Sequence, residues 1–234
     1  MTYRQGVNNA DWQQVLLEHC QLFADLPPDI IRRTLARPVL RSFPVNHVIF
    51  LENDGGASIH FILQGWVKIR THNLDGKEIT LNILTRGDLF GEMAALEQIP
   101  RSTDVITLVD TQVCSIPAED FLNLVATEPK AGMRLAQLLA LRLRQVNRRL
   151  RLREADSTAR LTDVLLFLAD GQGKHQGQGC TIPSLPHREL SSLSGLARET
   201  VTRVLSKLEK RGLIERDRSL MHIPDLEALE RIVG

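Results

Sequence analysis

The hydrophobic pattern of this 234-residue chain changes once, near Ala118. Before that point, apolar residues come in short runs rich in β-branched side chains, at 47–51, 58–63, 65–72, 78–84, 102–108 and 111–116. Turn-forming residues separate several runs, about ten residues apart, which is typical of an antiparallel sandwich or barrel. After Ala118, apolar residues recur three and four apart, as they do in helices. The switch predicts an α+β chain, with a β-rich domain followed by helices.

Two local patterns refine the β-rich domain, which we place at residues 1–128. Apolar residues between Trp12 and Phe23 fall at helical spacing, and Pro27–Pro28 can open a second helix that continues through Leu35. Short helices are therefore expected ahead of the strands. Asp75–Gly76 is the strongest hairpin signal, because this pair suits a tight turn between two strands.

Composition and charge exclude several classes of protein. Hydrophobic residues make up 43% of the chain and charged residues 24%, which are values of a folded globular protein. Because 29 basic residues face 28 acidic ones, the net charge of +1 indicates no nucleic-acid partner by itself. No apolar run approaches the roughly 18 residues of a membrane span, and the start lacks the apolar core of a signal peptide. The three cysteines show no CxxC spacing, which favours a reducing cytoplasm.

A long helix is predicted from Pro129 to about Asp156. Its apolar residues form a heptad-like seam, at Ala136, Leu139, Leu143, Val146 and Leu150. One interpretation is a helix that packs on its own β domain. The other is a dimer coiled coil, which we favour because six arginines crowd the stretch from Arg142 to Arg153 without an acidic residue among them. We therefore assign residues 129–156 as a dimerisation helix.

The last segment, residues 157–234, contains two short helical patterns around Gly195. A helix, a tight turn and a second helix over 186–211 are typical of a helix-turn-helix, and glycine suits the turn if its φ is positive. Residues 213–223 are expected to follow as a two-stranded wing, whereas the Gly- and Gln-rich residues 171–179 predict a surface loop. The second helix would bury one face, formed by Val201, Val204, Leu205 and Leu208.

The opposite face of that helix carries side chains suited to nucleic acid. Arginine pairs with guanine and glutamate accepts from cytosine, so Arg198, Glu199 and Arg203 are expected to read base edges. Lys207 and Lys210 suit phosphates. A plain helical hairpin with a solvated charged face is the alternative, and the nearly neutral charge of the segment does not decide between them. The full set expected at DNA is Arg188, Arg198, Glu199, Thr200, Thr202, Arg203 and Lys207.

Two segments are more specific than these periodicities. Residues 87–105, GDLFGEMAALEQIPRSTDV, resemble the phosphate-binding cassette of cyclic-nucleotide domains, and residues 194–214, SGLARETVTRVLSKLEKRGLI, resemble a recognition helix. In this order they resemble the cyclic-AMP receptor protein and fumarate–nitrate regulator superfamily of bacterial transcription factors, over almost the whole chain. The resemblance implies an N-terminal β-roll (a jelly roll like those that bind cyclic nucleotides), a long dimerisation helix and a C-terminal winged helix-turn-helix.

The same resemblance implies a function. The chain would be a homodimer that binds a palindromic site on double-stranded DNA and works with RNA polymerase, without a membrane. An effector between β-roll and long helix would bias the helix packing and so set the spacing of the two recognition helices. Two rivals stay open: a regulator that needs no ligand, and a cyclic-nucleotide module that serves protein partners.

The cassette residues suit a cyclic phosphodiester. Such a ligand carries one negative charge and needs a guanidinium with N–H or hydroxyl donors, which Arg101 and Ser102 supply near a short helix that starts at Gly91–Glu92. By resemblance, the ribose faces Gly91–Glu92 and the phosphate faces Arg101, Ser102 and Thr103. The full set expected at the ligand is Gly91, Glu92, Met93, Arg101, Ser102, Thr103, Arg142 and Asn147.

Two positions depart from the family pattern. Arg142 aligns with a ligand-facing arginine of the cyclic-AMP receptor, but Val146–Asn147 replaces a base-reading Thr-Ser pair, and Ala197 stands where the helix-turn-helix often has serine. Asn147 can donate and accept, so it would still read an adenine edge. Cyclic AMP is therefore the expected effector, with another nucleotide, a cyclic dinucleotide, haem or no ligand as alternatives.

Other chemistries fit the sequence less well. An iron–sulfur cluster needs four thiolates, more than the three cysteines of this chain supply. Haem is harder to exclude, because His47, His60 and His72 lie in or beside predicted strands. No Ser-His-Asp spacing, carboxylate pair or P-loop appears, so we expect neither an enzyme nor a covalent cofactor nor a metal site.

Overall fold

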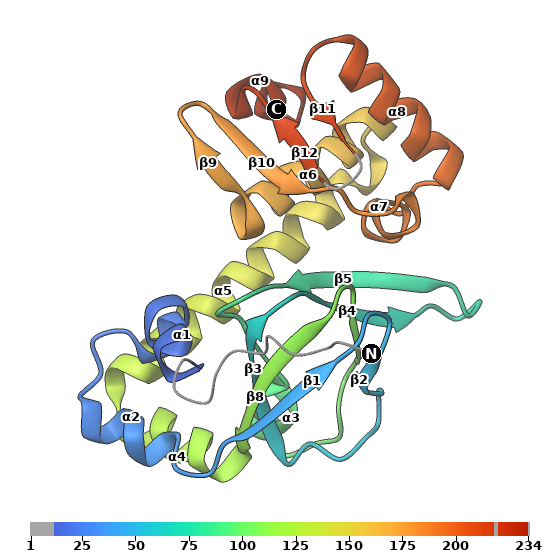
Figure 1. The fold of residues 1–234 in the computed structure, drawn as a ribbon. Coiled ribbons are helices and arrows are strands. Elements are labelled where there is room, and N and C mark those ends of the chain that lie inside the picture. Colours follow the sequence, from blue (N-terminus) through green and yellow to red (C-terminus); the bar gives the residue numbers. More distant parts are fainter. Residues whose placement is uncertain (1–11, 218–219, 234) are drawn as a thin grey trace, which may run out of the picture. The chain divides into compact units, whose positions relative to one another are not determined.

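The computed structural model describes residues 12–217 and 220–233 (Figure 1). The chain divides into two compact units. The first contains the chain up to Thr71 together with Leu81–Leu141, and the second contains His72–Thr80 together with the chain from Arg142 onward. Strands dominate the first half of the sequence and helices the second, which confirms the α+β class.

Short helices precede the first strand, as predicted. α1 spans Trp12–His19, the 3₁₀ helix η1 spans Gln21–Phe23, and α2 spans Pro28–Thr34. Pro28 occupies the first turn of α2, where its missing N–H costs no helical hydrogen bond. Apolar side chains from α1 and η1, including Leu16, enter the core of the first unit.

The β-rich region forms two antiparallel four-stranded sheets, with the orders β1-β8-β3-β6 and β2-β7-β4-β5. All six predicted runs are confirmed, as β2–β5, β7 and β8, and β1 and β6 are the two edge strands of the first sheet. Gly76 forms the predicted hairpin turn between β4 and β5, with a positive φ of 73°. The strands are β1 (Val39–Phe43), β2 (Val48–Phe50), β3 (Ser58–Gln64), β4 (Val67–His72), β5 (Glu78–Leu84), β6 (Leu89–Phe90), β7 (Asp104–Thr107) and β8 (Thr111–Pro117).

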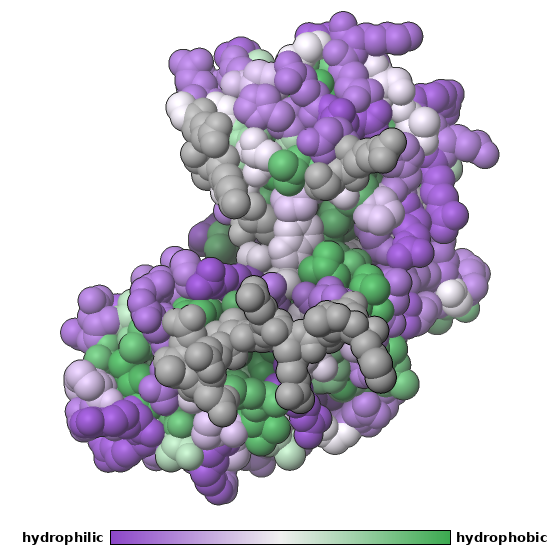
Figure 2. Space-filling view, viewed as in Figure 1, coloured by the Kyte–Doolittle hydropathy of each residue, from purple (hydrophilic) through white to green (hydrophobic). Residues whose placement is uncertain are grey.

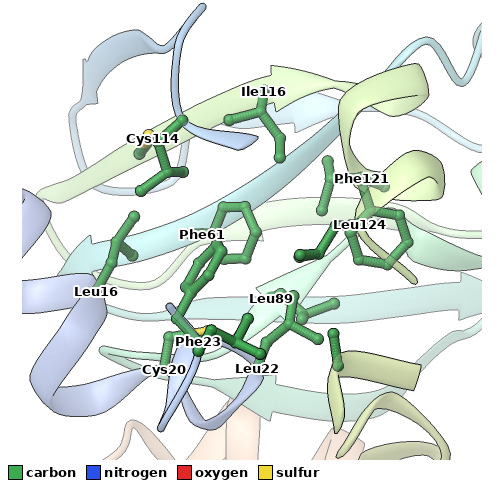
Figure 3. Close-up of a cluster of buried hydrophobic side chains, with 14 of the residues drawn as sticks. Leu16, Cys20, Leu22, Phe23, Phe61, Leu89, Cys114, Ile116, Phe121 and Leu124 are labelled. Atoms are coloured by element: carbon green, nitrogen blue, oxygen red, sulfur yellow. The ribbon is translucent and has the colours of Figure 1, made fainter. Parts of the chain in front are cut away.

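Strand β3 contributes to two buried clusters. Residues Ile59–Leu63 are all buried, yet successive side chains of a strand point to opposite faces of its sheet. Phe61 packs with Phe23 and with residues of α4 (Ala118–Thr127) in the cluster drawn in Figure 3. Ile62 belongs to the other cluster, on the opposite face. Burial on both faces explains why this run is apolar at every position except His60, rather than alternating.

The long helix α5 begins at Pro129, as predicted, and ends at Arg151, where a 3₁₀ helix follows. Its predicted seam is largely uncovered in the isolated chain. Leu143, Val146 and Leu150 are 60%, 43% and 54% exposed. Apolar side chains left open at heptad spacing need a further surface to cover them.

Acidic residues from other elements meet part of the positive charge of α5. Arg134 bonds to Asp25 at 2.8 Å. Arg148 contacts the buried Asp163 of α6 (Ser157–Gln172). Burial raises the pKa of Asp163, and the nearby arginine charge opposes that rise. The positive charge of α5 is therefore balanced in part within the chain.

Among the described residues, helices and one small sheet form the rest of the second unit, with α6 central and its Leu161, Leu165 and Leu168 fully buried. The sheet is antiparallel in the order β11-β12-β10-β9, so the predicted wing pair β11–β12 is confirmed. Within the predicted wing, residues 218–219 lie outside the described residues. The further elements are α7 (His187–Ser194), α8 (Arg198–Lys210), α9 (Leu226–Val233), β9 (Lys174–Gln176), β10 (Gly179–Pro183), β11 (Glu215–Arg216) and β12 (Leu220–Ile223).

One sequence prediction is wrong. The segment 171–179, expected to be a surface loop, contains the end of α6, strand β9 and the tight turn of a hairpin, in which His175 pairs with Cys180. Gly177 supplies the turn, with a φ of 60°. Strand β9 contains no β-branched residue, but it is an edge strand that takes its order from pairing with β10.

Candidate functional site

Gly91 opens the cassette in a conformation that only glycine adopts easily. It precedes α3 (Glu92–Glu97) in the left-handed region, with a φ of 86°. A Cβ at this position would collide with Arg101 Nη1 and would lie 3.3 Å from the carbonyl oxygen of Ser58. Gly91 thus allows the Arg101 guanidinium to lie directly against the start of α3.

Arg101 is the central residue of the cassette, and it is only 4% exposed. Its Nη1 donates to the carbonyl oxygen of Gly91 at 2.8 Å, and its Nη2 donates to that of Ser58 at 2.7 Å. The guanidinium carbon lies 4.3 Å from the centre of the Phe50 ring, a cation–π distance. Burial lowers the pKa of Arg101, and the charges of Glu92 and then Asp54 oppose this. The arginine is therefore held inward by backbone carbonyls and an aromatic face.

A series of hydrogen bonds leads from Arg101 through Ser58 and His60 to Ser115. Ser58 Oγ is 3.4 Å from Arg101 Nη2 and 3.2 Å from His60 Nε2, and His60 Nδ1 is 2.7 Å from Ser115 Oγ. Burial, followed by the charges of Arg101 and Arg41, lowers the pKa of His60 to about 3. The imidazole is therefore neutral near pH 7, and hydroxyl groups occupy both of its nitrogens. Neither nitrogen is open to a haem iron, in contrast to the haem alternative for this histidine.

The other predicted ligand residues of the cassette lie around Arg101. Glu92, the first residue of α3, is 4% exposed and lies close enough to Arg101 to affect its pKa. Ser102 is exposed, with its hydroxyl 4.0 Å from Met93 Sδ, and Thr103 is half-buried. The structure thus brings the cassette residues together around the start of α3.

Two predicted ligand residues lie farther along the chain. Arg142 is half-buried and Asn147 is exposed, both on α5 beyond Leu141 and so within the second unit. Their contact with a ligand stays a prediction. Sequence reasoning missed Ser58 and Phe50, because 43 residues separate Ser58 from Arg101 and no pattern along the chain links them.

The helix-turn-helix has the predicted turn. α7 ends at Ser194, Gly195 follows with a φ of 67°, and α8 begins at Arg198. Arg160 of α6 donates to the carbonyl oxygen of Ser194 at 2.6 Å and so caps α7. Ala197 stands at the N-cap of α8 without a side-chain hydrogen bond, so the first N–H groups of α8 remain available to an anion.

The two faces of α8 divide as predicted. Val201, Val204, Leu205 and Leu208 are buried. Arg198, Glu199, Thr202, Arg203 and Lys207 are exposed, and Thr200 is half-buried. In Figure 2, hydrophilic side chains gather at the upper right, the place of α8 in Figure 1. A surface hollow follows this face, lined by Thr202, Arg203, Ser206, Lys207, Lys210 and Arg211.

Several predicted DNA-facing side chains also contact neighbours. Arg203 Nη2 donates to Thr200 Oγ1 at 3.2 Å, so the structure pairs Arg203 with a threonine one turn earlier. Lys207 Nζ lies 3.5 Å from a threonine hydroxyl of α6. Arg188 is exposed and donates to the buried Glu189 at 3.0 Å.

Sequence reasoning also missed a polar cluster beside α8. Arg216 of β11 forms two hydrogen bonds with Glu209 near the end of α8, at 2.7 and 2.6 Å. Arg216 lowers the pKa of Glu209. The third member is His187, at the start of α7, whose Nε2 lies 3.3 Å from Arg216 Nη1. The cluster joins three elements of the second unit, so no local pattern could reveal it.

Within residues 12–217 and 220–233, no group of three or more His, Cys, Asp or Glu side chains is placed to hold a metal ion. In that same part of the chain, no helix is both long and apolar enough to cross a membrane.

Comparisons with known proteins match both regions. Residues 40–128 match the model of the cyclic nucleotide-binding domain, and residues 159–232 match that of the Crp-like helix-turn-helix domain. The cyclic AMP receptor protein of Thermus thermophilus is 32% identical over 212 residues, covering 90% of this chain and 95% of that protein. A CRP-like cAMP-activated global transcriptional regulator of Mycobacterium tuberculosis is 29% identical, covering 92% and 97%.

A solved structure shows the same likeness. The c-di-GMP responsive global regulator CLP of Xanthomonas campestris is 27% identical to this chain, with a TM-score of 0.65. The match covers 83% of this chain and 98% of that one. Both units of the chain therefore have counterparts in a single known protein.

Proposed function

Because the chain belongs to the CRP/FNR family of DNA-binding transcription regulators, we propose that it acts as a homodimer controlled by a cyclic nucleotide, with cyclic AMP as the first candidate. A regulator of this family is not an enzyme. The dimer would bind palindromic double-stranded DNA in the cytoplasm, with RNA polymerase as its partner. Its two recognition helices must then lie about 34 Å apart to enter successive major grooves.

The buried guanidinium of Arg101 carries the proposal of an anionic effector. Its Nε–H is buried and has no hydrogen-bond partner. Leaving a buried donor unpaired costs roughly 1–3 kcal/mol, and more for a charged group. A cyclic phosphate would supply the missing acceptor and a negative charge. The Ser102 hydroxyl and the backbone at Gly91 would add donors beside it.

The choice of cyclic AMP rests on two kinds of support. The relatives from Thermus thermophilus and Mycobacterium tuberculosis are both named for cyclic AMP. Asn147, exposed on α5, can donate and accept as an adenine edge requires. The Xanthomonas campestris regulator is named as responsive to c-di-GMP, so a cyclic dinucleotide is the second candidate.

Titration calorimetry tests the effector. The protein is titrated with cyclic AMP, cyclic GMP and c-di-GMP, and cyclic AMP is expected to bind most tightly. Arg101→Leu should abolish binding of each nucleotide, because it removes the guanidinium that would pair with the phosphate. Arg37→Leu is the matched control, since Arg37 pairs with Asp120 on the surface of the same unit. Circular dichroism checks that both variants fold. Equal affinities of wild type and Arg101→Leu would place the effector elsewhere.

The dimer proposal rests on the exposed seam of α5. Leu143, Val146 and Leu150 are apolar, exposed and spaced as the a and d positions of a coiled coil are. Burying them against a second copy of α5 would remove this apolar surface from water.

Leu143→Glu tests the dimer. Facing carboxylates would lie in the apolar seam, at a cost of several kcal/mol, so sedimentation should show a monomer. Leu141→Glu is the matched control, because Leu141 is 45% exposed and lies two residues away, on another face of α5. A dimer that persists in Leu143→Glu would contradict the coiled coil. Loss of the dimer in both variants would remove its assignment to this seam.

A further inference from the structure

Three hydrogen bonds run in one line from the wing to the start of the recognition helix. Arg216 Nη1 lies 3.3 Å from His187 Nε2. His187 Nδ1 lies 2.9 Å from Thr202 Oγ1. Thr202 Oγ1 in turn donates to the carbonyl oxygen of Arg198 at 3.0 Å. The line therefore crosses from β11 through α7 to the exposed face of α8.

The chemistry of these groups fixes the direction of every proton in the line. A guanidinium only donates, so His187 Nε2 must accept and carries no proton. The neutral imidazole then holds its proton on Nδ1 and donates it to Thr202 Oγ1. The hydroxyl proton of Thr202 goes to the Arg198 carbonyl, which is the remaining acceptor. No other tautomer of His187 satisfies all three contacts.

Glu209 holds Arg216, the first residue of this hydrogen-bonded series, in place. Its two oxygens accept from Arg216 Nε and Nη2, at 2.7 and 2.6 Å. Such a bidentate pair fixes the plane of the guanidinium. Arg216 Nη1 is thereby directed at His187, and the orientation of the Thr202 hydroxyl follows from contacts outside α8.

We infer that Thr202 serves the recognition helix as a hydrogen-bond acceptor only, and so selects a base that presents an amino group. Its single proton is used by Arg198, and one lone pair accepts from His187, which leaves one lone pair for DNA. In the major groove, cytosine N4 and adenine N6 are donors, whereas the guanine O6 and thymine O4 oxygens are acceptors. This specificity rests on the proposed DNA-binding function. His187 and Arg216 act as positioning residues.

The tautomer of His187 is the first test, and it needs no DNA. Nitrogen-15 NMR of the full-length protein should show a protonated Nδ1 and an unprotonated Nε2 for His187. Arg216→Met removes the donor and should let the ring populate both tautomers. A wild-type ring that is protonated on Nε2 would overturn the inference, whatever the DNA result.

Selection on randomised half-sites is the second test. Thr202→Val keeps the shape and the methyl group but loses the acceptor, so preference for adenine or cytosine should fall roughly two- to tenfold at one position per half-site. Thr202→Ser should restore it. Arg216→Met should relax the same position. Thr181→Val is the matched control, because Thr181 also bonds a histidine, His222 at 3.1 Å, but on the small sheet.

The outcomes separate this inference from the proposed function. An unchanged consensus for Thr202→Val overturns the inference, as does an affected position that carries guanine or thymine opposite the threonine. Failure of the wild-type protein to select any DNA would instead overturn the function on which the inference rests.

Discussion

The cassette and helix α8 use arginine in opposite ways. Arg101 is 4% exposed and bonds to backbone carbonyls of its own unit, whereas Arg198 and Arg203 lie exposed on a helix whose other face forms the core. In the cassette, the group that would bind a ligand also belongs to the fold. On α8, folding and recognition are assigned to different faces. Substitutions in the cassette should therefore change stability and binding together, while those on α8 should change binding alone.

The largest difference in stability is expected between alanine variants of two glycines that share one backbone conformation. Gly91 and Gly195 both have positive φ. Replacing Gly91 by alanine adds a Cβ that collides with the buried Arg101, so we expect a loss of roughly 2–4 kcal/mol in unfolding free energy. Gly195→Ala meets only Arg160 Nη2, at 2.7 Å on an exposed turn, and should cost about 1–2 kcal/mol. Urea denaturation measures both.

Nucleotide affinity sharpens this prediction. Gly91→Ala should also weaken nucleotide binding, because Arg101 must move, whereas Gly195→Ala should leave it unchanged. If the two variants lose equal stability and bind equally well, Arg101 does not stabilise the fold of the cassette.

Sequence patterns predicted the elements well where the hydrophobic periodicity and the turn-forming residues agree. The six strand runs, the start of α5 at Pro129 and the two faces of α8 follow from spacing alone. The boundaries of the three predicted segments stay predictions. Strand β9 was missed because its pairing with β10, and not its own composition, orders it.

The inward position of Arg101 could not be predicted. The arginine was expected to point at a ligand, yet its present acceptors are backbone carbonyls at Gly91 and Ser58. A backbone carbonyl exists at every residue, so no sequence pattern marks the two that fold against a side chain. The same holds for the line from Arg216 to Thr202, whose members come from separate elements.

The second prediction concerns acid. The pKa of His60 falls from 6.5 to about 3 in the folded protein, so below pH 6.5 the unfolded chain binds a proton that the folded chain does not. Stability is therefore complete above pH 6.5 and falls as the pH drops toward 3, by up to about 1.4 kcal/mol per pH unit. Between pH 6.5 and 4.5 this amounts to about 2–3 kcal/mol.

A variant isolates this histidine from other acid-sensitive groups. His60→Gln should be less stable at pH 7, because it loses the bonds to Ser115 and Ser58, but its stability should fall less steeply with acid. His72→Gln, at an exposed histidine that ends β4, is the control and should keep the wild-type slope. Identical slopes for wild type and His60→Gln would contradict a buried neutral imidazole.

The third prediction concerns the exposed arginines of α8. Arg198→Ala should cost on the order of 1–3 kcal/mol in binding to the preferred site and relax one position per half-site. Its urea midpoint should stay at the wild-type value, because Arg198 is exposed at the start of α8. Arg203→Ala should behave alike at a different position. A selected consensus with unchanged information at every position would remove the assignment of α8 as the recognition helix.

The smallest effect is expected at Lys210, in the last turn of α8. A lysine there meets phosphate or solvent, so Lys210→Gln should weaken all DNA sequences alike and reduce the slope of affinity against salt by about 1. Lys207→Gln is an informative partner, because Lys207 Nζ lies 3.5 Å from Thr158 Oγ1 and must leave this hydroxyl to reach a phosphate, so its slope should change less. Titrations at several salt concentrations measure both slopes. If Lys210→Gln altered the consensus instead, base reading would extend along the whole of α8, and the division between its first turns and its last would have to be abandoned.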